Sequence, residues 1–387
     1  MIKAFFLLIA LSQPLDSSEF ISPAQIIKEA AKLEADSNYE KAIGLYLTIS
    51  ANDTSYIQIQ SNLMSAYNSL EQYDKCISIG EKLKEEPSDF RCSIYITLGN
   101  AYLNKGDMAK GEAIYREGLK LFPYNYILLY NLGYVLQKQE QYEEAINYFQ
   151  KSARINPFYG NNHMMLGYIS MLQGHITKSF LSYLTYLAIN PNSNSILVFL
   201  NNLADDGIRK EGSITPFLEN QFFAYYDDLI RSKAALDSRF QQKVDFNADV
   251  VKQTELLLSK LEYKKNSNDF WMDFYVPLYT TLEDKQLSPA FIYYLLKSTK
   301  KEEILKWIDK HDKEKDEWID YVNKILKQNR DRNYVDISGQ KEKISHWFFD
   351  NNKLNAIGNQ IDNEKKMGHG YFIVEIASLM HKEVIMT

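Results

Sequence analysis

Apolar residues in the first half of the chain follow a helical spacing that recurs at a fixed interval. The three clearest copies are residues 92–125, 126–159 and 160–193, each 34 residues long. A period of this length predicts stacked helical hairpins, because one hairpin cannot bury its apolar face alone. The positions shared by the three copies are Leu98-Gly99, Leu132-Gly133 and Leu166-Gly167, then Tyr115, Phe149 and Tyr183, then Pro123, Pro157 and Pro191.

Weaker copies precede these three. Residues 57–91 keep several of the same positions in register, and residues 23–56 form a divergent copy. Residues 194–206 continue as one more apolar helix, which we expect to cover the open end of the stack. In each hairpin the glycine should let the partner helix approach closely, and the proline should end the second helix, since proline cannot extend a helix without a clash. The small residues expected at the helix crossing are Cys76, Gly111, Ala145 and Ser179.

This pattern resembles the tetratricopeptide repeat over about residues 23–206. The resemblance implies a mainly α protein with a right-handed α-superhelix of about five repeats plus a capping helix. It also implies a concave face, lined by the first helix of each repeat, where family members bind a segment of a partner protein.

In the family, repeat positions 2, 5, 9, 12 and 13 usually contact the bound peptide. Carried onto this sequence, they give a groove that is polar and uncharged at one end and rich in tyrosine and methionine at the other. Such a groove suits a segment with apolar or aromatic side chains. In the alternative, the tyrosines and methionines pack against the C-terminal half of the same chain. The candidate partner-binding residues are Asn100, Asn104, Tyr130, Tyr134, Gln137, Asn161, Met164, Tyr168 and Met171.

The 34-residue period stops after residue 206. Residues 207–335 contain further apolar stretches at helical spacing, including an amphipathic stretch at 249–264 and a helix start at Ser288-Pro289. We expect one irregular helical domain there, with its many aromatic residues in the core.

In residues 341–387 the helical spacing ends, and aromatic pairs are separated by Asn-rich turns and regular glycines. This pattern predicts a small β-meander. The segment resembles a MORN-type repeat over about residues 346–373. The matching residues are Phe348-Phe349, Lys353-Leu354, Gly358, Lys365-Lys366, Gly368 and Tyr371-Phe372.

Residues 1–12 are typical of a signal peptide. Lys3 precedes eight apolar residues at 4–11, and Ala10 and Ser12 fit a cleavage site before Gln13. We therefore expect a secreted or periplasmic protein without a membrane span, because eight apolar residues cannot cross the hydrocarbon core of ~30 Å. Asn52-Asp53-Thr54 is a glycosylation sequon, which matters only if the host glycosylates its exported proteins.

The chain has two cysteines, Cys76 and Cys92. The repeat register puts them at opposite ends of neighbouring helices, ~15 Å apart at 1.5 Å per residue, whereas a disulfide needs Cα atoms within ~7 Å. We expect two free thiols.

The composition and motifs give little support to an enzyme or a nucleic-acid binder. The net charge is −6, whereas proteins that bind nucleic acid through phosphates usually have a basic excess. No metal-ligand spacing, phosphate loop or catalytic motif is present in the sequence, so we expect no metal and no cofactor. The sequence therefore predicts an exported scaffold for protein–protein interaction. The alternative is a hydrolase-like enzyme with its site in residues 207–387 and the repeats as a docking arm.

Overall fold

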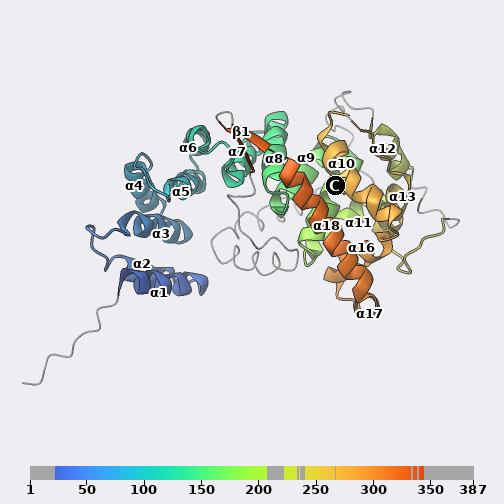
Figure 1. The fold of residues 1–387 in the computed structure, drawn as a ribbon, viewed down its shortest axis with the longest axis horizontal. Helices are drawn as coiled ribbons and strands as arrows, with labels where there is room; N and C mark the ends of the chain where they lie inside the picture. The colour runs from blue at the N-terminus through green and yellow to red at the C-terminus, as the bar shows by residue number, and fades with distance from the viewer. Residues whose placement is uncertain are drawn as a thin grey trace, which may run out of the picture. The chain divides into compact units, whose positions relative to one another are not determined.

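The structure is a computed structural model, and it describes seven stretches of the chain (Figure 1). These stretches divide into two compact units, the first ending at Lys105 and the second beginning at Gly106. The division falls inside the predicted repeat 92–125, and the second unit runs across residue 206 into the middle region. The described residues are 22–206, 222–232, 235, 240–265, 267–332, 334–337 and 340–343.

The first unit is a row of helices in which each helix packs against the next, and α3 also packs against α5. Ser22 starts the row with a capping box, in which its hydroxyl accepts from the Gln25 amide and the Gln25 side chain accepts from the Ser22 amide. Gly80 lets three helices approach, because a Cβ there would lie 2.7 Å from Met64 Cε and 2.9 Å from Leu98 Cδ1. The helices are α1 (Pro23–Ala35), α2 (Tyr39–Tyr46), α3 (Tyr56–Ser69), α4 (Tyr73–Leu83) and α5 (Arg91–Asn104).

Both cysteines lie in this unit, at the places that the repeat register predicts. Cys76 is buried in the first turn of α4, and Cys92 is the second residue of α5. Both thiols are free. Burial raises the pKa of the Cys76 thiol to about 12 and that of Cys92 to about 11, so neither is a reactive thiolate near neutral pH.

The second unit begins with the second helix of the repeat 92–125, followed by the helix pairs of the next two repeats. Pro123, Pro157 and Pro191 each follow the second helix of a pair by two residues, which confirms their predicted role as helix stops. Gly133 faces the ring of Phe149, and a Cβ at Gly133 would lie 3.0 Å from it, so the predicted close approach is also confirmed. The helices are α6 (Met108–Leu121), α7 (Tyr126–Lys138), α8 (Tyr142–Ile155), α9 (Gly160–Leu172), α10 (Ile176–Ile189) and α11 (Asn194–Asp206).

A residue with positive φ follows the first helix of each repeat. After four of these residues, Ser37, Glu71, Glu140 and Gly174, the amide of the next residue donates to the carbonyl five residues back, which is a Schellman-type helix end. This bond measures 2.7 Å from Asn38 to Leu33 and 2.8 Å from Gln141 to Leu136. The positive-φ residues of the five repeats are Ser37, Glu71, Gly106, Glu140 and Gly174.

The middle region is helical, as predicted, and belongs to the second unit. The predicted stretch at 249–264 forms a helix at Asp249–Lys260, and Ser288-Pro289 begins another helix. α11 packs against α10 and also against α13. The elements are α12 (Ala224–Arg231), α13 (Asp249–Lys260), α14 (Phe270–Phe274), α15 (Val276–Asp284), α16 (Ser288–Leu295), the 3-10 helix η2 (Leu296–Thr299), α17 (Glu302–Lys310) and α18 (Asp312–Arg332).

The connection from α15 to α16 has the same geometry as the turn inside each repeat. Gln286 has φ 58°, and the next amide, of Leu287, donates 2.8 Å to the carbonyl of Leu282, five residues back. The positions that hold small residues in the repeats hold rings here, and the rings of Tyr279 and Phe291 lie 5.8 Å apart. This hairpin therefore keeps the turn of a repeat but not its sequence signature.

The β-meander predicted for residues 341–387 is not supported. The described strands are β1 (Tyr334–Ile337) and β2 (Gln340–Lys343), which form one antiparallel hairpin in register Tyr334 with Lys343. The hairpin begins before the predicted segment, and residues 344–387, with the whole MORN-like stretch, lie outside the described residues. The signal peptide at 1–12 lies outside them too.

Candidate partner-binding surface

In the first unit, the first helices of the repeats carry a row of uncharged polar side chains. The Ser61 and Ser93 hydroxyls are 2.9 Å apart across α3 and α5, and the Asn104 amide donates 3.3 Å to the Asn68 carbonyl oxygen between the same helices. These contacts hold the row in register along both helices. We call Ser61, Ser65, Asn68, Ser93, Asn100 and Asn104 the polar face.

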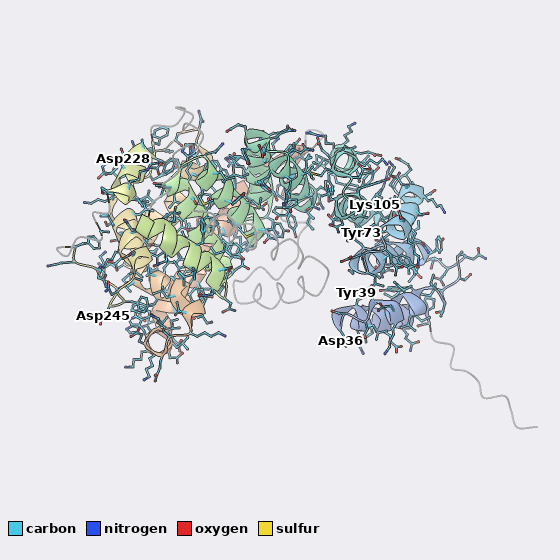
Figure 2. All side chains as sticks on the ribbon, turned by 180° about the vertical axis from the view of Figure 1, so that it is seen from behind. Asp36, Tyr39, Tyr73, Lys105, Asp228 and Asp245 are labelled. Atoms are coloured by element: carbon cyan, nitrogen blue, oxygen red, sulfur yellow. The ribbon has the colours of Figure 1, made fainter. Side chains whose placement is uncertain are left out.

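The two candidate residues in the first unit belong to this polar face. Asn104 is exposed and Asn100 is half-buried, while Ser65 and Ser93 are exposed beside them. An exposed carboxamide offers both a donor and an acceptor, so it can bind the amide groups of another chain. Lys105, labelled in Figure 2, directly follows Asn104 and pairs with Asp74.

The aromatic and methionine candidates of the second unit are interior residues. Tyr130, Tyr134, Met164 and Tyr168 are all less than 10% exposed. The Tyr130 ring packs 5.4 Å from that of Phe149 and 5.1 Å from that of Tyr159. Burial raises the pKa of Tyr130, with smaller contributions from the neighbouring hydroxyls of Tyr134 and Tyr186.

The remaining three candidates lie at the margin of this buried group. Gln137, Asn161 and Met171 are half-buried, and Asn161 donates 3.2 Å to the Tyr159 hydroxyl. The nine candidate residues thus differ in exposure and do not form one accessible surface. The two in the first unit are accessible, whereas four of the seven in the second unit are covered, and their role in binding stays a prediction.

The last repeat is covered by the middle region through a buried ion pair. Lys178 of α10 pairs with Asp269, the N-cap of α14, at 3.2 Å, and both side chains are at most 10% exposed. The Lys178 ammonium also lies 4.5 Å from the centre of the Trp271 ring and 5.6 Å from that of Phe223. A buried charge requires such compensation, because an unpaired one costs several kcal/mol, on the order of 3–5.

Hydrogen bonds from α14 and from two more helices extend this contact along α10. The Asp227 carboxylate of α12 accepts from the Thr177 amide at 2.7 Å, which places a negative charge at the N-terminal end of α10. Trp271 Nε1 donates 3.0 Å to the Ser182 hydroxyl, and the Tyr279 hydroxyl lies 2.6 Å from that of Thr185. We call these contacts of α10 with α12, α14 and α15 the docking interface.

A buried histidine joins the previous helix to the same interface. His163 of α9 is fully buried, with Nδ1 2.6 Å from the Tyr275 hydroxyl and Nε2 2.8 Å from the Pro157 carbonyl oxygen. Burial lowers the pKa of His163 to about 4, so the ring is neutral at neutral pH. A neutral ring can donate to Pro157 and accept from Tyr275, which satisfies both nitrogens.

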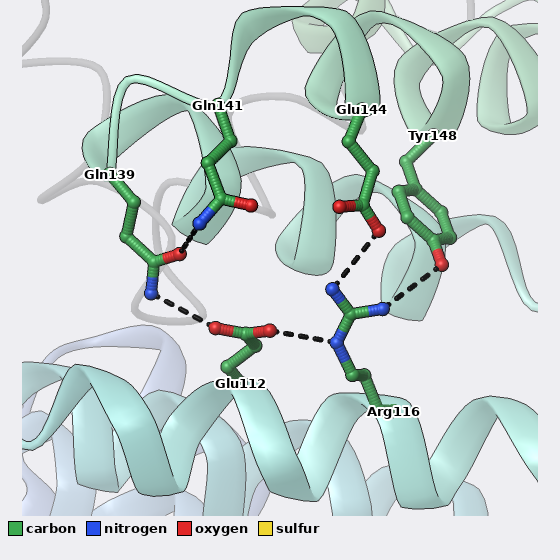
Figure 3. A network of polar contacts seen from close by, with 6 residues as sticks. All are labelled: Glu112, Arg116, Gln139, Gln141, Glu144 and Tyr148. Atoms are coloured by element: carbon green, nitrogen blue, oxygen red, sulfur yellow. Dashed lines mark hydrogen bonds and ion pairs between the residues drawn. The ribbon is translucent and has the colours of Figure 1, made fainter.

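Polar side chains on the outside of α6 and α8 join two neighbouring repeats (Figure 3). Arg116 bonds to Glu112 at 2.7 Å and to Glu144 at 3.0 Å, and it donates to the Tyr148 hydroxyl at 3.4 Å. Gln139 completes the network by donating to Glu112 at 2.9 Å. These groups are partly exposed and mutually paired, which is the arrangement of a structural contact between repeats.

Catalytic and metal chemistry finds little support among the described residues. Within them, no group of three or more His, Cys, Asp or Glu side chains could hold a metal ion, and no helix is long and apolar enough to span a membrane. His163 and Asp227 are two titratable groups of the second unit whose pKa values are shifted by burial, and each has a partner in the docking interface.

Comparisons with known proteins agree with the repeat architecture. Models of the tetratricopeptide repeat match residues 93–125 and 126–159. Residues 93–159 therefore carry tetratricopeptide repeats, as the sequence pattern predicts.

Two curated relatives carry the same kind of repeat. Tetratricopeptide repeat protein 21B of Xenopus laevis is 25% identical over 134 residues, which is 34% of this chain and 10% of that protein. Tetratricopeptide repeat protein 16 of Homo sapiens is 22% identical over 161 residues, which is 38% of this chain and 18% of that protein. This chain thus spans less than a fifth of the length of either relative.

Two solved structures share a likeness with part of the chain. A thermophilic TPR protein of Thermus thermophilus has a TM-score of 0.40 at 14% identity and covers 46% of this chain and 96% of its own. MamA of strain AMB-1 has a TM-score of 0.33 at 15% identity, with the same two coverages. Both TM-scores are below 0.5, so neither likeness bears on function.

Our sequence analysis missed the docking interface, although one signal was present. α10 has a single charged residue, Lys178, in 14 positions, whereas α6 has five in the same length. A second helix without a polar face must be covered on all sides. That signal could have predicted that the last repeat is enclosed.

Proposed function

We propose that the chain is an exported interaction scaffold that binds a segment of a partner protein on the polar face of α3 and α5. The contrast between the two units carries the proposal. On the polar face, Ser65, Ser93 and Asn104 are exposed, whereas Tyr130, Tyr134, Met164 and Tyr168 of the second unit are buried. Ser61 is buried, and Asn68 and Asn100 are half-buried. The exposed candidate residue, Asn104, therefore belongs to the polar face.

The chemistry of the polar face favours a neutral segment bound through hydrogen bonds. Hydroxyl and carboxamide groups can donate and accept, so they can bind the peptide groups of an extended chain without ion pairs. We therefore expect the affinity to change little between low and high salt, unlike an interface that depends on exposed charges.

The test begins with capture of partners by the full-length protein in an extract of its own host, identified by mass spectrometry. The affinity of the identified partner is then measured for wild type and for the Asn100→Ala/Asn104→Ala variant. We expect the double substitution to weaken binding at least tenfold, which corresponds to about 1.4 kcal/mol. The Lys82→Ala variant, an exposed change on the second helix α4, serves as the matched control.

Two results would contradict this proposal. The first is unchanged affinity in the Asn100→Ala/Asn104→Ala variant. The second is loss of binding in Lys82→Ala, which would move the contact to the second helices.

Export is the second part of the proposal and depends on the features of residues 1–12. N-terminal sequencing of protein from the host should find a chain that begins near Gln13, outside the cytoplasm. Intact Met1 on cytosolic protein would contradict export and leave the binding proposal standing. No observation among the described residues favours the alternative enzyme, so we propose no second function.

A further inference from the structure

The loop between α2 and α3 carries the one Asn-x-Ser/Thr triplet in the sequence, Asn52-Asp53-Thr54. This triplet is the acceptor signal for N-linked glycans, and an acceptor must lie on the surface of an exported protein. Asn52 and Thr54 are both exposed. The two residues that define the signal are therefore accessible in the folded chain.

The residue between them is held inside the loop by its neighbours. The Asp53 carboxylate accepts from the Ser55 amide at 2.8 Å and from the Ser55 hydroxyl at 2.6 Å. These bonds lower the pKa of Asp53, the Ser55 hydroxyl contributing most. The carboxylate is thus engaged with Ser55, whereas the Asn52 side chain is exposed.

An exposed apolar side chain stands in the same loop region. Leu47, directly after α2, is 63% exposed, the highest value among the large hydrophobic residues that the structure describes. A glycan five residues further along could shield such a side chain, because glycans are bulky and solubilising. The loop joins a second helix to a first helix and does not include the polar face, so a glycan here is compatible with partner binding.

We infer that Asn52 is an N-glycosylation site, an inference that rests on the export part of the proposed function. In the reaction, the Asn52 amide nitrogen forms a bond to the anomeric carbon of an oligosaccharide. The bond from that carbon to a lipid diphosphate breaks, and the diphosphate leaves with the bonding electrons. The amide proton goes to a base of the transferase, and no oxidant or reductant is needed.

The test uses the full chain expressed through a eukaryotic secretory pathway, once with its own first residues and once behind a proven leader. Secreted protein is treated with peptide-N-glycosidase, which converts a glycosylated asparagine to aspartate, and residue 52 is read by mass spectrometry. We expect conversion at Asn52 in wild type and in Thr54→Ser, and no glycan in Asn52→Gln or Thr54→Ala.

The two arms separate the failure of this inference from the failure of export. Secreted protein without a glycan behind the proven leader would overturn the inference. A glycan behind that leader, with no secretion from the chain's own first residues, would support the inference and contradict export. Glycosylation that persists in Thr54→Ala would also overturn it, because the modified residue would then lie elsewhere.

Discussion

Helices α6 and α10 hold the same place in their repeats and have the same length, yet their surroundings differ. Only four residues of α6 are buried, whereas every residue of α10 is buried. The four in α6 are Gly111, Ile114, Tyr115 and Gly118. The difference comes from the docking interface, which covers the outer side of α10. A repeat sequence thus specifies the hairpin, but the elements packed outside it decide whether the hairpin is surface or core.

The first helices show the same contrast at the ninth position of the repeat. Asn100 in α5 is half-buried, whereas Tyr134 in α7 and Tyr168 in α9 are less than 10% exposed. Removing a buried aromatic side chain loses its contacts and leaves a cavity. Substitutions at these matched positions therefore test directly which repeats expose their first helices.

The largest expected effect is at the ninth position of α9. We expect Tyr168→Ala to lower the free energy of unfolding by ~3–5 kcal/mol, as for other buried aromatics. We expect Asn100→Ala to cost ~1 kcal/mol or less, since it removes a half-buried polar group. Chemical denaturation of the full-length variants would measure both. Equal costs for the two would mean that Tyr168 is not a core residue.

A smaller effect is expected at the nineteenth position, where two lysines can be compared. Lys178→Met leaves the Asp269 carboxylate buried without its counter-ion, at a cost of ~3 kcal/mol. Lys110→Met, on α6, removes an exposed pair with Asp107 at 3.2 Å and should cost well under ~1 kcal/mol. Thermal melting of both variants is the measurement. A mild effect of Lys178→Met would show that the docking interface does not depend on this pair.

Acidification should weaken the docking interface through His163. Its pKa is lowered from 6.5 to about 4 by burial, so the unfolded chain binds the proton more readily. The stabilisation is fully present above pH 6.5 and is lost as the pH falls toward 4, by up to about 3 kcal/mol. Unfolding measured at pH 7.5 and pH 4.5 would show this loss.

His163→Gln provides the control for that titration, because glutamine does not titrate. The variant should lose less stability on acidification than wild type, whatever its stability at pH 7.5. Asp227 has a pKa raised by burial, so its contribution has the opposite sign and remains in both proteins. An identical pH dependence in wild type and His163→Gln would exclude His163 as the source.

The smallest effect is expected in the Arg116 network between α6 and α8. Its side chains are 23–41% exposed, and exposed ion pairs contribute ~1 kcal/mol or less each. Arg116→Gln should therefore cost ~1 kcal/mol at low salt and less at high salt, because salt screens such pairs. Stability of wild type and variant at two salt concentrations would measure this, and a loss that does not depend on salt would count against the electrostatic explanation.

Most of the repeat architecture could be predicted from the sequence, because its determinants are local. The leucines, glycines and prolines of the 34-residue period fix helix packing and helix ends within one hairpin. The α15–α16 hairpin escaped prediction because rings at Tyr279 and Phe291 replace the small residues on which the period depends.

The candidate surface was harder to predict because burial depends on elements distant in sequence. His163 and Tyr275 are 112 residues apart, and Lys178 and Asp269 are 91 apart. A local sequence pattern cannot predict contacts between residues so far apart in the chain. The sequence placed Tyr130, Tyr134, Met164 and Tyr168 on the first helices and left open whether their side chains are covered.

The complete enclosure of α10 restricts how this array can change in length. Repeat arrays commonly grow or shrink by duplication or loss of whole hairpins, since each hairpin contacts mainly its neighbours. A hairpin inserted between α10 and α11 would separate α10 from α11, while α12, α14 and α15 must still reach Thr177, Lys178 and Ser182. Copies added ahead of α9 leave those bonds intact. Because α8 also packs against α18, the number of repeats is free to vary on the N-terminal side of α7 and is fixed beyond it.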